Sequence, residues 1–168
     1  MKLFSALGVA SAAAGASLLV PGSAAATDVH CTSDRGVDIT VVEGRTACRA
    51  VTDTLGQARA AGFDGVGYAS ATFGAIALGV GAGGGVGASE GEGGMPIAIG
   101  LGPDAIALTS LSGTGSADDT LGLTIALYGS RAQVTAADNS VVCLGAGAFA
   151  WNSATGASCL VTPFYLRA

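Results

Sequence analysis

Residues 75–104 read AIALGVGAGGGVGASEGEGGMPIAIGLGPD, and this stretch decides the fold that we expect. It divides into three pieces of ten residues, in which Ala, Val, Ile or Leu alternate with small residues before a cluster of Gly or Asp. Such alternation is typical of a β-strand with one buried face, and such clusters are typical of turns. Each piece therefore predicts one strand followed by one turn.

Similar pieces of eight to ten residues continue on both sides, from residue 47 to residue 156. A strand-turn unit repeated this often is typical of a solenoid, in which two units of roughly nine residues make one two-sided turn. We therefore predict an all-β protein, a short β-solenoid or β-roll of strand-turn units of about nine residues, stapled by two disulfides.

Two alternatives to the solenoid remain open. Residues 46–61 also fit an amphipathic helix that stops at Gly62, which would give an α+β fold with a Gly-rich sheet. Residues 65–89 contain no charged residue, and glycines four residues apart within them form a pattern that packs helices in membranes. Contact of this segment with a membrane is the second alternative.

The expected core is lined by small and aliphatic side chains. Two sheets whose inner faces carry Ala and Gly approach more closely than the usual separation of about 10 Å. The inward-facing candidates are Ala58, Ala60, Ala69, Ala71, Ile76, Leu78, Ile97, Ile99, Ile106, Leu108, Ile125, Leu127, Val134, Val142 and Leu144.

Residues 1–26 have the order of a secretory signal peptide. Lys2 precedes an uncharged run from residue 3 to residue 20, after which Pro21 and Gly22 precede small residues that end at Ala26. We expect cleavage after Ala26, which would leave one disulfide-stapled mature domain, residues 27–168, secreted or associated with the cell envelope. An uncleaved membrane anchor is the alternative.

The composition and the net charge argue against a nucleic-acid-binding protein. Only 11% of the residues are charged and 5% are aromatic, whereas globular chains carry roughly 25% charged residues. The segment after residue 26 contains six arginines, no lysine and twelve acidic residues, so its formal charge is −6. Binding to nucleic acid is therefore not expected.

Four cysteines, Cys31, Cys48, Cys143 and Cys159, lie in the segment that would be exported. In an exported chain an even number of cysteines predicts disulfides. The two near each end are 17 and 16 residues apart, about one solenoid turn. We therefore expect the pairs Cys31–Cys48 and Cys143–Cys159, each between adjacent rungs about 4.8 Å apart. A zinc site that includes His30 is the alternative, although it lacks close cysteine pairs.

Side chains with catalytic or metal-binding chemistry are few. His30 is the only histidine, and no GxSxG pattern supplies the nucleophile that a hydrolase centred on it would need. One partial match to a calcium-binding repeat, residues 102–106, is too little for a ladder of calcium sites. Two acidic pairs lie in turns rich in Gly or Ser, namely Glu90 with Glu92 and Asp118 with Asp119. We predict no catalytic residue, no metal ligand and no cofactor.

Phe149 and Trp151 are the candidate ligand platform. They are two residues apart, so a strand presents both on the same face. A sugar or an envelope lipid is the ligand class that such a platform suits. A cap over the apolar end of the last solenoid turn is the role that we favour for both side chains, and the platform is the alternative.

Several segments resemble a known family. They are TACRA (46–50), DGVGYA (64–69), GVGASE (85–90), SRAQV (130–134) and the closing VVCLG, AWN and SCL (141–160). Together with the four-cysteine layout they resemble a family of small exported Gly/Ala-rich proteins of unknown function from high-GC Gram-positive bacteria. The resemblance implies export, paired cysteines and Gly/Ala-rich repeats, and it implies no catalytic or binding residue.

The predicted function is that of an exported structural or interaction protein of the cell envelope or exterior, without catalytic activity. A secreted binding module for an envelope glycan or lipid is the alternative. Cell-envelope components are candidate partners, and self-association through the solenoid ends is a further candidate.

Overall fold

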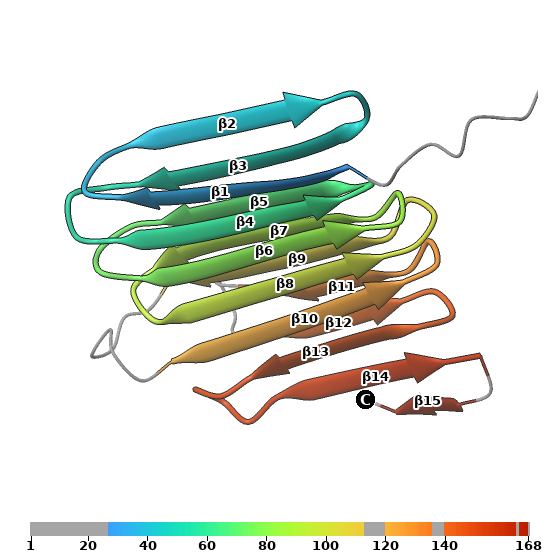
Figure 1. Ribbon diagram of the computed structural model, residues 1–168. Helices are drawn as coiled ribbons and strands as arrows, with labels where there is room; N and C mark the ends of the chain where they lie inside the picture. Colours follow the sequence, from blue (N-terminus) through green and yellow to red (C-terminus); the bar gives the residue numbers. More distant parts are fainter. Residues whose placement is uncertain (1–26, 113–119, 136–139, 164, 168) are drawn as a thin grey trace, which may run out of the picture.

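The computed structural model describes residues 27–112, 120–135, 140–163 and 165–167, so the expected signal peptide lies outside the described residues. The described residues form strands and no helix (Figure 1). The strands are β1 (Asp28–Asp34), β2 (Asp38–Glu43), β3 (Thr46–Thr52), β4 (Gln57–Phe63), β5 (Val66–Ala71), β6 (Ile76–Ala82), β7 (Val86–Glu92), β8 (Met95–Leu101), β9 (Ile106–Ser112), β10 (Leu121–Leu127), β11 (Arg131–Val134), β12 (Val141–Leu144), β13 (Ala148–Asn152), β14 (Ser158–Thr162) and β15 (Tyr165–Arg167).

The prediction of a β-solenoid is confirmed. From β3 to β11 successive strands alternate between two sheets, whose orders are β1-β4-β6-β8-β10-β13-β14-β15 and β12-β11-β9-β7-β5-β3-β2. We call these the first and the second sheet. Parallel pairing of β4, β6, β8 and β10 in the first sheet, and of β3, β5, β7, β9 and β11 in the second, winds about three turns. Figure 1 shows the resulting flat stack.

One turn of the solenoid is slightly longer than the two nine-residue units that the sequence predicts. Ala47 pairs with Val66, and Val66 pairs in turn with Val86. Strands of six or seven residues leave room for short turns on both edges of the stack. The repeat is therefore regular enough to align side chains of one strand with those of the next turn.

The helix alternative is wrong. Residues 46–61 form β3, a turn and most of β4, because their alternate residues are buried between the sheets as a strand requires. Residues 65–89 likewise form β5, β6 and the first part of β7. In the described part of the chain no helix is long and apolar enough to cross a membrane.

Both ends of the stack change from parallel to antiparallel pairing. At the N-terminal end β1 pairs antiparallel with β4, and β2 with β3. At the C-terminal end β13 pairs antiparallel with β10, and β12 with β11. The winding of the solenoid therefore stops at these hairpin-like strands, which close ends that would otherwise fray.

The predicted disulfide pairing is confirmed, but its geometry differs from the expectation. Cys31 bonds Cys48 and Cys143 bonds Cys159, with Cα atoms 5.7 and 5.9 Å apart. The bridges cross the core between facing sheets and do not join adjacent rungs of one sheet. The antiparallel strands are the reason, because β2 pairs with β3 and leaves β1 on the facing layer, and β13 pairs with β14 and leaves β12 on the facing layer.

The prediction of inward-facing side chains is confirmed only in part. Ala58, Ala60, Ala69, Ala71 and Val134 are buried. The other ten candidates point outward, with small neighbours buried in their place. These ten are Ile76, Leu78, Ile97, Ile99, Ile106, Leu108, Ile125, Leu127, Val142 and Leu144.

The reason for this inversion is the close approach of the two sheets. A Cβ atom built on Gly79 of β6 would lie 1.8 Å from the carbonyl oxygen of Tyr68 on β5. The same atom on Gly87 would lie 2.0 Å from the carbonyl oxygen of Val80, and on Gly100 2.0 Å from that of Val86. Backbone meets backbone at these points, so the interior there has no space for Ile or Leu, and the large side chains of these strands lie outside.

Candidate functional site

The large aliphatic side chains gather on the outer surface of the first sheet. We call the outward-facing residues of β6, β8, β10 and β13 the apolar face. They are Ile76, Leu78, Val80, Ala82, Met95, Ile97, Ile99, Leu101, Leu121, Leu123, Ile125, Leu127, Phe149 and Trp151. None of them carries an ionisable group, and contiguous apolar surface of this kind is rare on soluble monomers unless it binds something.

The register of the strands turns these residues into straight rows. One row runs through Leu78, Ile97, Leu123 and Trp151, and the next runs through Val80, Ile99, Ile125 and Phe149. Side chains in adjacent strands partly cover each other, so most are only partly exposed to solvent. Ile76 and Met95, at the ends of their strands, are 46% and 42% exposed. The apolar face is therefore a flat grid and not a scatter of single residues.

The outer surface of the second sheet is mixed in character. Its central row runs through Arg49, Tyr68, Ala88, Leu108 and Gln133. Arg49 also binds Asp38 of the neighbouring β2 through two hydrogen bonds of 3.1 and 2.7 Å, which lower the pKa of the Asp38 carboxyl group. The two outer surfaces thus differ in chemistry, and the apolar one is the candidate functional site.

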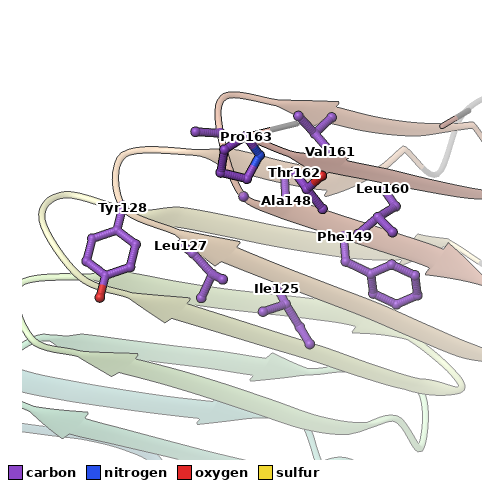
Figure 2. A pocket seen from close by; sticks show the side chains of 11 residues that line it. Ile125, Leu127, Tyr128, Ala148, Phe149, Leu160, Val161, Thr162 and Pro163 are labelled. Atoms are coloured by element: carbon purple, nitrogen blue, oxygen red, sulfur yellow. The ribbon is translucent and has the colours of Figure 1, made fainter. Parts of the chain in front are cut away.

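A hollow of about 500 Å³ opens at the C-terminal part of the apolar face (Figure 2). Figure 2 shows Ile125 and Leu127 of β10 on one side of the hollow and Phe149 of β13 with Leu160 of β14 on the other. Pro163 and Tyr128 lie at its rim. Its size and apolar lining fall within the range of small-molecule sites, and its chemistry suits an alkyl chain.

Only one of the two residues of the predicted platform lines the hollow. Phe149 lies between Ile125 and Leu160 in the register and lines the hollow. Trp151 lies between Leu123 and Ser158 and is not among the residues that line it. Both side chains share the apolar face because Ala148, Ala150 and Asn152 take the inward positions of β13. They therefore extend this face and do not cap the end of the stack.

The residues with acid-base or metal-binding chemistry are spread over different surfaces. His30 is exposed on β1, where its ring packs edge-on against Phe63 with centroids 5.3 Å apart. Glu90 and Glu92 are exposed on the outer side of β7, whereas Asp118 and Asp119 lie outside the described residues. Within the described ranges no group of three His, Cys, Asp or Glu side chains is placed to hold a metal ion.

Asp53 supports the turn between β3 and β4. Its Oδ1 atom accepts hydrogen bonds from the backbone N–H groups of Leu55 and Gly56 at 2.9 and 2.7 Å, and Oδ2 accepts one from Phe73 at 2.6 Å. The bond from Phe73 contributes most to lowering the pKa of the Asp53 carboxyl group, followed by that from Leu55, while desolvation opposes them. Because Phe73 follows β5, this carboxylate connects two successive turns of the solenoid.

We expect Asp53→Asn to be less stable than the wild type at pH 7, because the amide group turns a donor toward one of these N–H groups. The carboxylate has a lower pKa in the folded state than its unfolded value of about 3.9, so its stabilisation is fully present above pH 4 and is lost as the pH falls below it. The difference in unfolding free energy between the two proteins should narrow in urea titrations from pH 6 to pH 3. The exposed Asp28→Asn is the control for loss of charge, and a difference unchanged by pH would contradict this role of Asp53.

Fold and surface together define a class: a disulfide-stapled β-solenoid with a Gly/Ala interior and one apolar outer face. The chain matches a family of unknown function, DUF6764, over residues 1–162 and belongs to this family. No curated protein and no solved structure matches it.

The sequence contains signals for part of this site. Phe149 and Trp151 share one strand face, as their spacing predicts. The hydrophobic pattern assigns the aliphatic residues of β6, β8 and β10 to the core, so it misses the face to which they belong. The hollow depends on Leu160 and Pro163, which β14 brings beside β13, and no local pattern in the sequence indicates that contact.

Proposed function

We propose that this protein is exported and works outside the cytoplasm as a non-catalytic structural or interaction protein of the cell envelope or exterior. The observation that carries the proposal is the position of the two disulfides, each of which joins the two sheets at one end of the stack. Disulfides form and persist in oxidising compartments. All cysteines of the chain are paired in this way.

The build of the stack supports a structural role. Its interior consists mainly of Ala, Gly and small hydroxyl residues, including a hydrogen bond of 2.6 Å between the Thr109 and Thr124 hydroxyl groups. Antiparallel strands and disulfides close both ends. His30 packs on Phe63 and its neighbour Cys31 is consumed in a disulfide, which fits a non-catalytic protein.

Export is tested by producing the full chain in a Gram-positive host and analysing medium, envelope and cytosol by mass spectrometry. We expect a product that begins at Thr27, has no free thiol, and lies in the medium or the envelope fraction. A variant that lacks residues 2–26 is the control and should stay in the cytosol. Retention of the uncleaved full chain in the cytosol with free thiols would overturn the proposal.

A second candidate function is the binding of an envelope lipid. The hollow beside Phe149 favours it, since its walls of Ile125, Leu127 and Leu160 are apolar and suit an alkyl chain rather than a sugar. Trp151 lies on β13, as Phe149 does, so its fluorescence should change when a lipid binds in the hollow.

A further inference from the structure

We propose that the apolar face binds the apolar face of a second copy of this chain, so that the protein is a face-to-face dimer. This inference rests on the proposed role as an interaction protein and names its partner. The apolar face is the outer surface of the first sheet, formed by β6, β8, β10 and β13.

The outward position of the aliphatic side chains is the first reason to expect a dimer. In an ordinary β-sandwich, Ile, Leu and Val lie between two sheets about 10 Å apart. In this protein the interior is filled mainly by Ala, Gly and small hydroxyl residues, and residues such as Ile97, Ile99 and Ile125 point away from it. A second apolar face laid on the first would create the sandwich core that the monomer lacks.

The regular spacing of the side chains on the apolar face is the second reason to expect a dimer. Rows of side chains repeat about every 4.8 Å across the strands and about every 6.6 Å along them. A surface with another spacing meets this grid at only a few points, whereas a second copy has the same spacing over its whole extent. An isologous contact of this kind uses one patch on both partners, and side chains interdigitate as they do between sheets of a steric zipper.

The available area is sufficient for a specific contact. Together with the flanking strands β4 and β14 of the first sheet, the apolar face covers roughly 600 Å² in projection. Specific interfaces begin at about 600 Å² per partner, so a contact that extends from the apolar face over β4 and β14 is large enough for a dimer. Phe149 and Trp151 add the aromatic side chains that are enriched at the centres of interfaces.

The distribution of charge favours the apolar face over the N-terminal end of the stack. No outward position of the apolar face carries a charge, so two copies with a formal charge of −6 each meet there without local repulsion. The edge strands at the N-terminal end carry Asp28 and Asp34 on β1 and Asp38 and Glu43 on β2. Acidic edges of this kind prevent strand pairing between copies, which argues against self-association through this end.

The test is sedimentation equilibrium of the mature chain, residues 27–168, at roughly 1–100 µM. We expect the mass of a dimer, and a shift of the Trp151 emission to longer wavelength when dilution dissociates it. Ile99→Lys places a charge at the centre of the apolar face and should weaken association at least about 100-fold. Leu108→Lys is the matched control, because Leu108 holds the central outward position of β9 in the second sheet, and it should remain dimeric.

A wild-type protein that is monomeric over this range would overturn the dimer, as would a dimer that Ile99→Lys leaves intact. Circular dichroism and the absence of free thiols check that each variant is folded, and Ile125→Gln is the milder variant if Ile99→Lys does not fold. Native mass spectrometry checks for lipid, and a monomer that carries lipid would assign the face to a lipid instead. An exported, oxidised monomer would overturn self-association alone and leave the export proposal standing.

Discussion

Gly87→Ala is expected to lower the unfolding free energy by about 3 kcal/mol and the melting temperature by roughly 10 °C. The added Cβ would lie 2.0 Å from the carbonyl oxygen and 2.8 Å from the nitrogen of Val80, which belong to the facing strand. Neither backbone can yield locally, because β7 pairs with β5 and β9, and β6 pairs with β4 and β8. The sheets would have to separate, which would loosen the contacts of neighbouring turns.

The expected loss of stability in Gly87→Ala is opposite in sign to the usual effect of Gly→Ala. Gly87 has no left-handed backbone conformation, and at such positions Gly→Ala usually stabilises a protein by about 0.4–1 kcal/mol through the unfolded state. Ala88→Val on the outward side of the same strand is the matched control and should change stability by no more than about 0.5 kcal/mol. Thermal and urea unfolding measure both variants, and a Gly87→Ala variant as stable as the wild type would contradict backbone contact between the sheets.

Removal of both disulfides is the second change with a large expected effect. Each bridge closes a loop of 16 or 17 residues, which corresponds to about 3 kcal/mol in the chain-entropy account. The bridges lie at opposite ends of the stack, so their contributions should add. The sum of about 6 kcal/mol is comparable to the whole stability of a small domain, about 5–15 kcal/mol.

We therefore expect the variant with all four cysteines changed to Ala to be largely unfolded at 37 °C. Two double variants each lack one bridge: Cys31→Ala with Cys48→Ala, and Cys143→Ala with Cys159→Ala. Each should lose about 3 kcal/mol of unfolding free energy, half of the loss expected for both bridges, and remain folded at 25 °C. Alanine suits these sites because the core around Cys31 and Cys48 consists largely of alanine. Urea unfolding followed by circular dichroism compares the three variants, and a four-alanine protein with the wild-type urea midpoint would show that the stack does not depend on its bridges.

The strands and the disulfide pairs could be predicted because both depend on spacing. Alternation over six or seven residues followed by Gly or Asp indicates a strand and a turn wherever it occurs. The even cysteine count and the near-equal separations limit the pairing. Spacing does not reveal which of two alternate sets of residues faces the interior, and the choice of the aliphatic set is wrong for β6, β8, β9, β10 and β12.

The sequence nevertheless holds a signal that identifies the interior. In β4, Arg59 alternates with Ala58 and Ala60, and a charged residue in a thin core is far more costly than an exposed aliphatic one. In β7, Glu90 occupies the same alternate set as Val86. Because the repeat is nearly constant in length, this assignment extends to the neighbouring turns. The charged positions of the sequence, and not the hydrophobic ones, therefore indicate which side of each strand faces inward.

The apolar face followed only from the three-dimensional register. The sequence shows which residues alternate within a strand, but the rows arise because Ile99 of β8 lies beside Val80 and Ile125 of its neighbours. The segment between β9 and β10 makes the step from Met95 to its partner Leu121 longer than the corresponding step in the preceding turns. A strict repeat read from the sequence would place β10 in the wrong register, and the rows would be lost.

Contact between the backbones of the two sheets accounts for the small interior and the outward aliphatic side chains, and nuclear Overhauser contacts measure it most directly. Gly79 on β6 faces Tyr68 on β5, and a Cβ position on Gly79 is 3.1 Å from the Tyr68 nitrogen. We expect a cross-peak between the Gly79 α-protons and the Tyr68 amide proton, and corresponding cross-peaks for Gly100 with Val86 and Gly87 with Val80. Absence of all three, together with contacts from Leu78 and Ile99 side chains to the second sheet, would show an ordinary separation of about 10 Å and contradict backbone contact between the sheets.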